Sequence, residues 1–125
     1  MKTVDIELGN ITIAYTCERP ALPLLEIIKE DIHKLEMEIH KVSNEPLMLL
    51  DDLENILTAI DSLLMQMGTY SEPSPFKWLN KWFLAVAYSQ TSIRTPDWIN
   101  NTIISNFIKS LNTAVDELIL EAREL

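Results

Sequence analysis

Glycine and cysteine are scarce in this chain, and each scarcity excludes a class of site. Two glycines cannot build a phosphate-binding loop or a nucleophile elbow, because both motifs need several glycines at fixed spacing. A single cysteine, Cys17, excludes an intrachain disulfide and is typical of a reducing compartment. We expect Cys17 to be a small, partly buried apolar residue near the end of a strand.

Long apolar runs are also missing. No segment approaches the ~20 consecutive apolar residues that a bilayer-spanning helix needs. Asp5 and Glu7 interrupt the N-terminal segment, which argues against the apolar core of a signal peptide. A length of 125 residues with 47% hydrophobic residues predicts a single domain, residues 1–125, with a sizeable core. We therefore expect a cytoplasmic protein that does not bind membranes.

Positive charge is absent between Lys41 and Lys77, an interval that holds six acidic residues. Residues 26–72 contain eleven acidic and three basic residues, a net charge of −8, whereas the whole chain has −9. Such a concentration of negative charge repels nucleic acid and favours cationic partners or metal ions. Nucleic-acid binding is also disfavoured because it needs clustered Lys and Arg to neutralise phosphates.

The N-terminal residues 1–16 have the alternation of a β-hairpin. Val4, Ile6 and Leu8 alternate with polar residues, and the alternation resumes after Gly9-Asn10. A Gly-Asn pair between two such runs is a turn signal, because glycine supplies the positive φ of a tight turn. A lone hairpin is only marginally stable, so this one is expected to lie on the rest of the chain or to pair with another sheet.

Residues 22–125 predict helices. Apolar residues recur at steps of three and four, first as Leu25, Ile28, Ile32, Leu35, Ile39 and Val42, then as Leu50, Leu53, Leu57, Ile60, Leu64 and Met67. Gly68 is expected to end the second helix, and residues 69–75 to form a solvated linker. A third helix is expected over residues 76–88, and a fourth begins at Thr95-Pro96-Asp97. The predicted fold class is mainly α, an N-terminal β-hairpin followed by a four-helix bundle.

The two histidines, His33 and His40, do not predict a metal site. Glu30 and His33 have the Glu-x-x-His spacing of carboxylate-bridged di-iron bundles, but such bundles need this spacing on two helices and it occurs once here. Both histidines fall one residue beyond the apolar face of their helix. We expect an exposed polar surface there, with no metal and no cofactor.

One enzyme hypothesis stays open. All-α nucleotide pyrophosphohydrolases hold Mg²⁺ with carboxylate pairs on two consecutive helices, and Asp51-x-x-Glu54 offers one such pair. The first helix has His33-x-x-Glu36 instead of a second pair. A Mg²⁺-dependent nucleotide hydrolase is therefore an alternative, and a helical structural subunit of a larger assembly is another.

The interpretation we prefer is a small acidic binding protein, not an enzyme, that masks a basic surface of another protein. Most concretely, it would be an immunity protein or antitoxin that neutralises a cationic nuclease toxin, because this role needs acidic side chains and no catalytic residues. The aromatic residues Tyr70 and Trp78 are possible anchors for the partner. The expected partner-binding acids are Glu45, Asp51, Asp52, Glu54 and Asp61.

Overall fold

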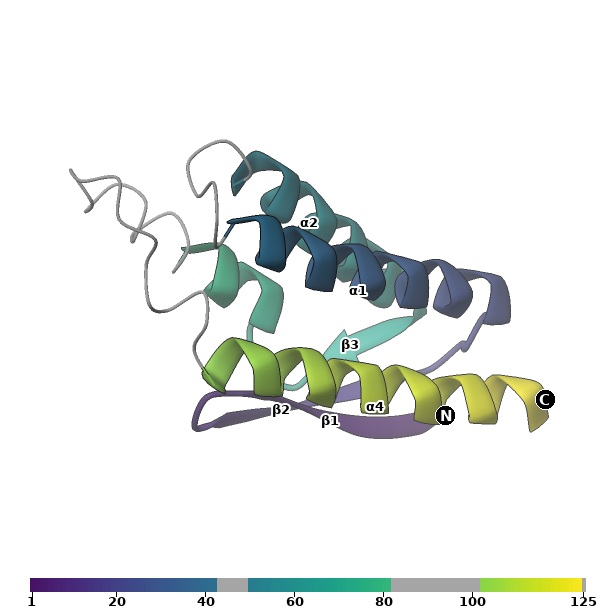
Figure 1. Cartoon of the computed structure of the whole chain (residues 1–125). Helices are drawn as coiled ribbons and strands as arrows, with labels where there is room; N and C mark the ends of the chain where they lie inside the picture. The colour runs from purple at the N-terminus through teal and green to yellow at the C-terminus, as the bar shows by residue number, and fades with distance from the viewer. Residues whose placement is uncertain (43–49, 82–101, 125) are drawn as a thin grey trace.

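The computed structural model describes the backbone of residues 1–42, 50–81 and 102–124, and the side chains of residues 1–39, 52–81 and 104–124. The described chain is mainly helical, with antiparallel strands at its N-terminus (Figure 1). In chain order the elements are β1 (Lys2–Leu8), β2 (Ile11–Cys17), α1 (Leu22–Val42), α2 (Leu50–Met67), β3 (Gly68–Tyr70), a helical segment over residues 75–81, and α4 (Thr102–Glu124).

The predicted hairpin is confirmed. β1 and β2 pair antiparallel with Leu8 opposite Ile11, so Gly9 and Asn10 form a two-residue turn. Gly9 has a φ of 62°, and Asn10 does not adopt a positive φ. A positive φ at the first central residue alone is the pattern of a type II′ turn, whose twist matches that of the flanking strands.

A third strand, β3, pairs antiparallel with β2 and completes a sheet of order β1-β2-β3. The expectation of a solvated linker over residues 69–75 is therefore wrong at both ends. Thr69 and Tyr70 belong to β3, and Ser74 and Pro75 are buried. The free edge of β2 offers backbone hydrogen bonds to the segment that follows α2. A three-residue strand is too short to show this pairing as an alternation of side chains.

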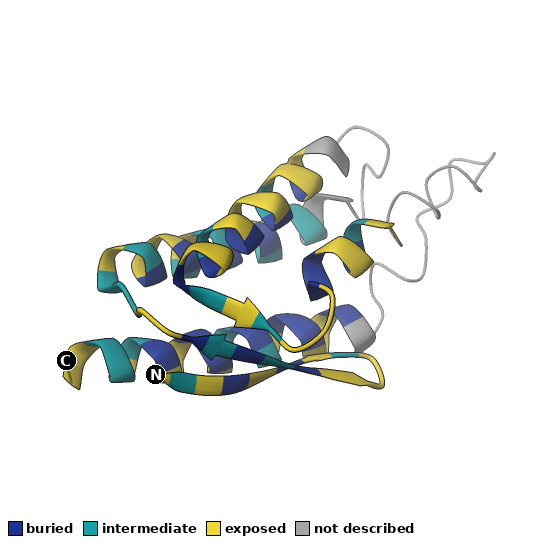
Figure 2. Ribbon diagram, turned by 180° about the vertical axis from the view of Figure 1, so that it is seen from behind, coloured by how far each residue is buried: buried dark blue, intermediate teal, exposed yellow. Residues whose placement is uncertain are grey.

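The core lies between one face of the sheet and the helices (Figure 2). α4 packs against β1 and α1, α1 also packs against α2, and α2 contacts β3. The central residues on the inner face of the hairpin are buried, whereas Lys2, Leu8 and Ile11 at its ends are half-buried or exposed, as are the residues that face the other way. The buried strand residues are Val4, Ile6, Ile13, Tyr15 and Cys17.

The apolar faces predicted for the first two helices are confirmed where side chains are described. Ile32 and Leu35 are buried in α1, and Leu57 and Ile60 are buried in α2. His33 is exposed, as expected. The bundle arrangement is not confirmed, because α1, α2 and α4 share their core with the sheet. In the described residues no helix is long and apolar enough to cross a membrane.

Several sequence predictions fall outside the described residues. The helix start Thr95-Pro96-Asp97 and most of the predicted helix over residues 76–88 lie there. The side chain of His40 is also not described. The prediction of a single domain over residues 1–125 is not tested by the elements above.

Candidate functional site

The predicted acidic surface begins at the start of α2. Asp52 and Glu54 are both exposed, and α2 contains no Lys or Arg. Glu45 and the side chain of Asp51 lie outside the described part of the chain. Because the macrodipole favours negative charge at a helix N-terminus, Asp52 and Glu54 also stabilise their own helix.

The expectation that Asp61 lies on this exposed surface is wrong. Its exposed fraction is 8%, and Oδ1 of its carboxylate accepts two hydrogen bonds. The Tyr70 hydroxyl donates one at 3.0 Å and the Ser74 hydroxyl donates the other at 2.8 Å. The segment after β3 folds back on α2 and covers this carboxylate. Asp61 therefore holds two segments of the chain together, and its charge is largely shielded from any partner.

Ser74 connects Asp61 to the helical segment over residues 75–81. The Ser74 hydroxyl oxygen accepts a hydrogen bond from the Phe76 N–H at 3.2 Å, which makes Ser74 the N-cap with Pro75 in the first helical position. Burial raises the pKa of the Tyr70 hydroxyl far above its usual value, and the negative charge of Asp61 raises it further. Tyr70 therefore stays neutral, and its hydroxyl donates a hydrogen bond to Asp61.

Of the two predicted aromatic anchors, only Trp78 has a large exposed area. Tyr70 is half-buried, with its ring centroid 5.3 Å from that of Tyr15 and its hydroxyl bound to Asp61. Trp78 is 50% exposed, and the ammonium group of Lys81 lies 6.0 Å from the centroid of its ring. An ammonium over an indole face is a favourable arrangement that keeps this aromatic surface beside a positive charge.

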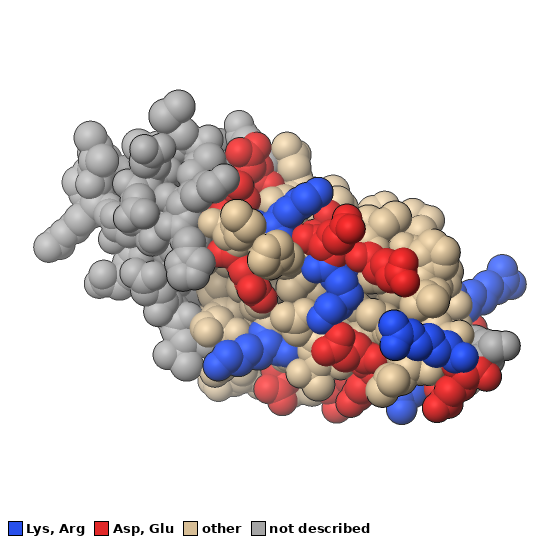
Figure 3. Space-filling model, turned by 45° about the vertical axis from the view of Figure 1, so that its right-hand side comes forward, with Lys and Arg blue, Asp and Glu red and all other residues tan. Residues whose placement is uncertain are grey.

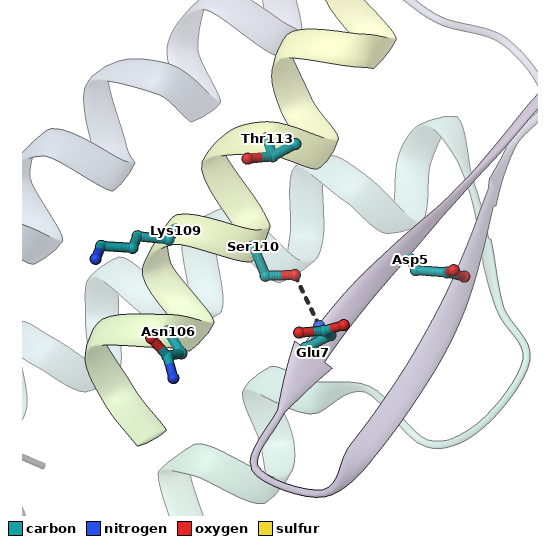
Figure 4. A pocket seen from close by; sticks show the side chains of 6 residues that line it. All are labelled: Asp5, Glu7, Asn106, Lys109, Ser110 and Thr113. Carbon is teal, nitrogen blue, oxygen red and sulfur yellow. Dashed lines mark hydrogen bonds between the residues drawn. The ribbon is translucent and has the colours of Figure 1, made fainter. Parts of the chain in front are cut away.

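An open groove lies between β1 and α4, and sequence reasoning did not find it (Figure 4). Its volume is about 380 Å³, and the Ser110 hydroxyl oxygen accepts a hydrogen bond from the Glu7 N–H at 2.9 Å across it. The alternation of the hairpin places Asp5 and Glu7 on one face, but it does not show that α4 lies beside them. The lining residues are Asp5, Glu7, Asn106, Lys109, Ser110 and Thr113.

The face formed by α1 and α4 carries both signs of charge (Figure 3). The Lys29 ammonium lies 2.8 Å from the Asp116 carboxylate and donates a hydrogen bond to Asn112 at 2.7 Å. Asn112 donates in turn to Glu36 at 3.3 Å. Lys29 therefore partly neutralises Asp116 of α4, and the Asn112 amide links this ion pair to Glu36 of α1.

Among the described side chains, no three His, Cys, Asp or Glu residues come together in a group that could hold a metal ion. Burial raises the pKa of the Cys17 thiol, which keeps it protonated and unreactive. Cys17 ends β2 and is fully buried, so it is more deeply buried than the sequence predicted.

No family model, curated protein or solved structure matches this chain.

Proposed function

We propose that this protein binds a basic surface of another protein through its exposed acidic side chains. The observation that carries this proposal is the charge of the exposed surface. Among the described side chains, eleven acidic residues are exposed against six basic ones. The exposed acids of α2 have no basic residue beside them on that helix, so their field extends into solvent.

The distribution of exposed apolar residues favours a binding protein over a structural subunit. A subunit packed between neighbours needs apolar residues that recur at steps of three or four along an exposed helix face. Among the described side chains of α1, the large exposed apolar residues are Ile27 and Met37, which are ten residues apart; the described parts of α2 and α4 have one each, Met65 and Leu120. These residues are scattered, which is ordinary for a protein surface.

The most concrete form of this proposal is an immunity protein or antitoxin that covers a cationic nuclease. A nuclease surface that binds phosphates is basic, so an acidic protein can occupy it without any catalytic group. Electrostatic steering raises the association rate, and rapid capture matters for a toxin that acts as soon as it is free.

Nuclease inhibition tests this proposal. The tagged chain is used to isolate its partner from the native host, and the partner is assayed for nucleic-acid cleavage with increasing amounts of the chain. We expect a basic partner whose cleavage stops at an equimolar ratio. The double variant Asp52→Asn with Glu54→Gln should inhibit less well.

The matched control is Asn55→Ala with Ser62→Ala, which changes two exposed residues of the same helix without changing its charge. This control should inhibit as the wild type does. A partner that is not basic, or a nuclease that stays fully active with excess chain, would contradict the proposal. Nucleotide hydrolysis by the chain itself, abolished by the double variant, would instead support the Mg²⁺-dependent enzyme.

A further inference from the structure

Among the described residues, the side chains of Asp5 and Glu7 on the outer face of the sheet are exposed, and the charged residues of its strands on that face are both acidic. Strands β1, β2 and β3 are described throughout, and α4, the described helix that packs against β1, borders this face at the groove that Asp5 and Glu7 line. Asp5 and Glu7 are its charged residues, and the other side chains are short. The residues of the three strands that point to this face are Thr3, Asp5, Glu7, Thr12, Ala14, Thr16 and Thr69.

The side chains that surround Asp5 and Glu7 on this face are threonines and one alanine, so none of them projects far from the sheet. The Thr3 and Thr16 hydroxyl oxygens are 3.0 Å apart across the strands, and Thr69 lies opposite Thr16 on β3. Hydroxyl groups that are bonded to one another along a sheet are held in place, so binding a partner costs little additional side-chain entropy. The side chains of the three strands therefore do not obstruct the approach of a protein surface to the carboxylates of Asp5 and Glu7.

The groove against α4 borders these carboxylates. Ser110 and Thr113 contribute hydroxyl groups and Asn106 contributes an amide, all from one side of α4. Lys109 is the basic residue among those that line the groove, and Figure 4 shows its side chain extending away from Asp5 and Glu7. The groove thus combines two carboxylates with neutral groups that can donate or accept hydrogen bonds.

In the described part of the chain, no residue forms an ion pair with Asp5 or Glu7. In α1 and α4, by contrast, Asp31 and Asp116 are partly neutralised, because Lys34 pairs with Asp31 and Lys29 with Asp116. We propose that the outer face of β1 and its groove against α4 form the surface that binds the basic partner, with arginine side chains of the partner placed on Asp5 and Glu7. This inference rests on the proposed function and names its binding surface.

Arginine fits the geometry of this surface. Asp5 and Glu7 are two residues apart on one strand face, a spacing of roughly 7 Å in an extended strand. A guanidinium group is planar and has five N–H donors, so it can bind a carboxylate and still donate to a neighbouring hydroxyl or amide oxygen. The carboxylates supply the charge, and Asn106 and Ser110 supply acceptors beside them.

Nuclear magnetic resonance with an octa-arginine peptide locates the binding surface. Backbone amide resonances of the full chain are followed while the peptide is added at low salt. We expect the largest shifts in residues 3–7 and around Ser110 and Thr113. Shifts centred on Asp52 and Glu54, or spread evenly over all exposed acids, would overturn the inference.

Two matched double variants separate this surface from the net charge. Asp5→Asn with Glu7→Gln and Asp52→Asn with Glu54→Gln each remove two exposed negative charges and keep the side-chain size. The first should weaken peptide binding about fivefold, which is the effect of losing two exposed ion pairs, and the second should weaken it less. Lys109→Gln should strengthen binding, because it removes positive charge at the groove.

The outcomes distinguish this inference from the proposed function. If the second double variant weakens binding as much as the first, or more, the inference is wrong and the proposed acidic binding function stands. If neither double variant changes peptide binding, both the inference and the proposed function are wrong. Dispersed amide resonances in each variant establish that it is folded, so an altered affinity is not a loss of structure.

Discussion

Asp52 and Asp61 lie on the same helix and have opposite environments. Asp52 is exposed near the start of α2, whereas Asp61 directly follows the core residue Ile60 and faces the segment after β3. The sequence places Asp61 beside the apolar face of α2, but it does not show that Tyr70 and Ser74 will donate to its carboxylate. A buried carboxylate of this kind receives its hydrogen-bond donors only when the segments that carry them pack against its helix.

Replacing Asp61 with alanine should destabilise the fold. The change leaves the Tyr70 and Ser74 hydroxyls without their acceptor, and unsatisfied buried donors cost about 1–3 kcal/mol. Asp52→Ala should change the free energy of unfolding by about 0.5 kcal/mol or less, because Asp52 is exposed. Urea unfolding of the two variants measures the difference. Equal stabilities would show that the Asp61 contacts contribute nothing.

Tyr70 should make the protein less stable at high pH. Its pKa in the folded chain is raised above the usual 10.0, chiefly by burial and then by Asp61, so the folded state keeps a proton that the unfolded chain releases near pH 10. The free energy of unfolding should therefore fall as the pH rises above about 10. Burial raises the pKa of Tyr15 as well, with the same sign.

Tyr70→Phe removes the contribution of Tyr70 to this pH dependence and leaves the contribution of Tyr15. Its free energy of unfolding should fall less steeply above pH 10 than that of the wild type. Urea unfolding at a series of pH values measures both slopes. Parallel curves for the two proteins would contradict the assignment of this effect to Tyr70.

At the scale of the elements, Gly68 shows why α2 ends where it does. The sequence predicts a glycine that ends the helix, and α2 does end at Met67. Gly68 does not have a positive φ, so left-handed backbone is not the reason for glycine here. A Cβ at this position would lie 2.0 Å from the Thr16 carbonyl oxygen, which is backbone and cannot move aside. Glycine is needed because α2 passes directly into a strand paired with β2.

Gly68→Ala should therefore separate β3 from β2 or shift α2. Overpacking of this kind costs about 1–3 kcal/mol, and here the contact is with backbone. Thr69→Ala is the control, because Thr69 is the exposed neighbour in the same strand. Thermal or urea unfolding compares them. A Gly68→Ala protein as stable as Thr69→Ala would contradict the close approach of the two chains.

The apolar face of α1 is expected to dominate the stability of the helical layer. Ile32→Ala and Leu35→Ala each remove a fully buried side chain and should each cost about 2–5 kcal/mol, from lost burial and from the cavity left behind. His33→Ala should cost little, because His33 is exposed. Denaturant midpoints measure this contrast, and a large loss in His33→Ala would overturn the assignment of the two helix faces.

Elements with a long periodic pattern could be predicted from the sequence, and β3 could not. The hairpin and the faces of α1 and α2 each repeat an apolar spacing over several turns or residue pairs, which fixes both type and buried side. β3 has three residues and is held by backbone hydrogen bonds to β2, which leave no trace in side-chain type. The pairing of β3 with β2 completes the three-stranded sheet, and the helices share their core with that sheet.

At the scale of the whole molecule, charge along the sequence is an incomplete guide to charge on the surface. Residues 26–72 hold most of the net charge, yet Asp61 is buried and Asp31 pairs with Lys34. Asp5 and Glu7 belong to a segment that is almost neutral in sequence, yet both are exposed, line the groove against α4 and form no ion pair with a described residue. The sequence therefore predicts an acidic protein, whereas the tertiary structure decides which acids are exposed.

The most direct test of a charge-driven binding protein is the salt dependence of its association rate. Stopped-flow mixing of the chain with its isolated partner gives this rate between about 0.01 M and about 0.15 M salt, where the screening length falls from about 30 Å to about 8 Å. We expect the association rate to fall by about tenfold or more over this range, with a much smaller change in the dissociation rate. An association rate that is the same at both salt concentrations would contradict the proposed function.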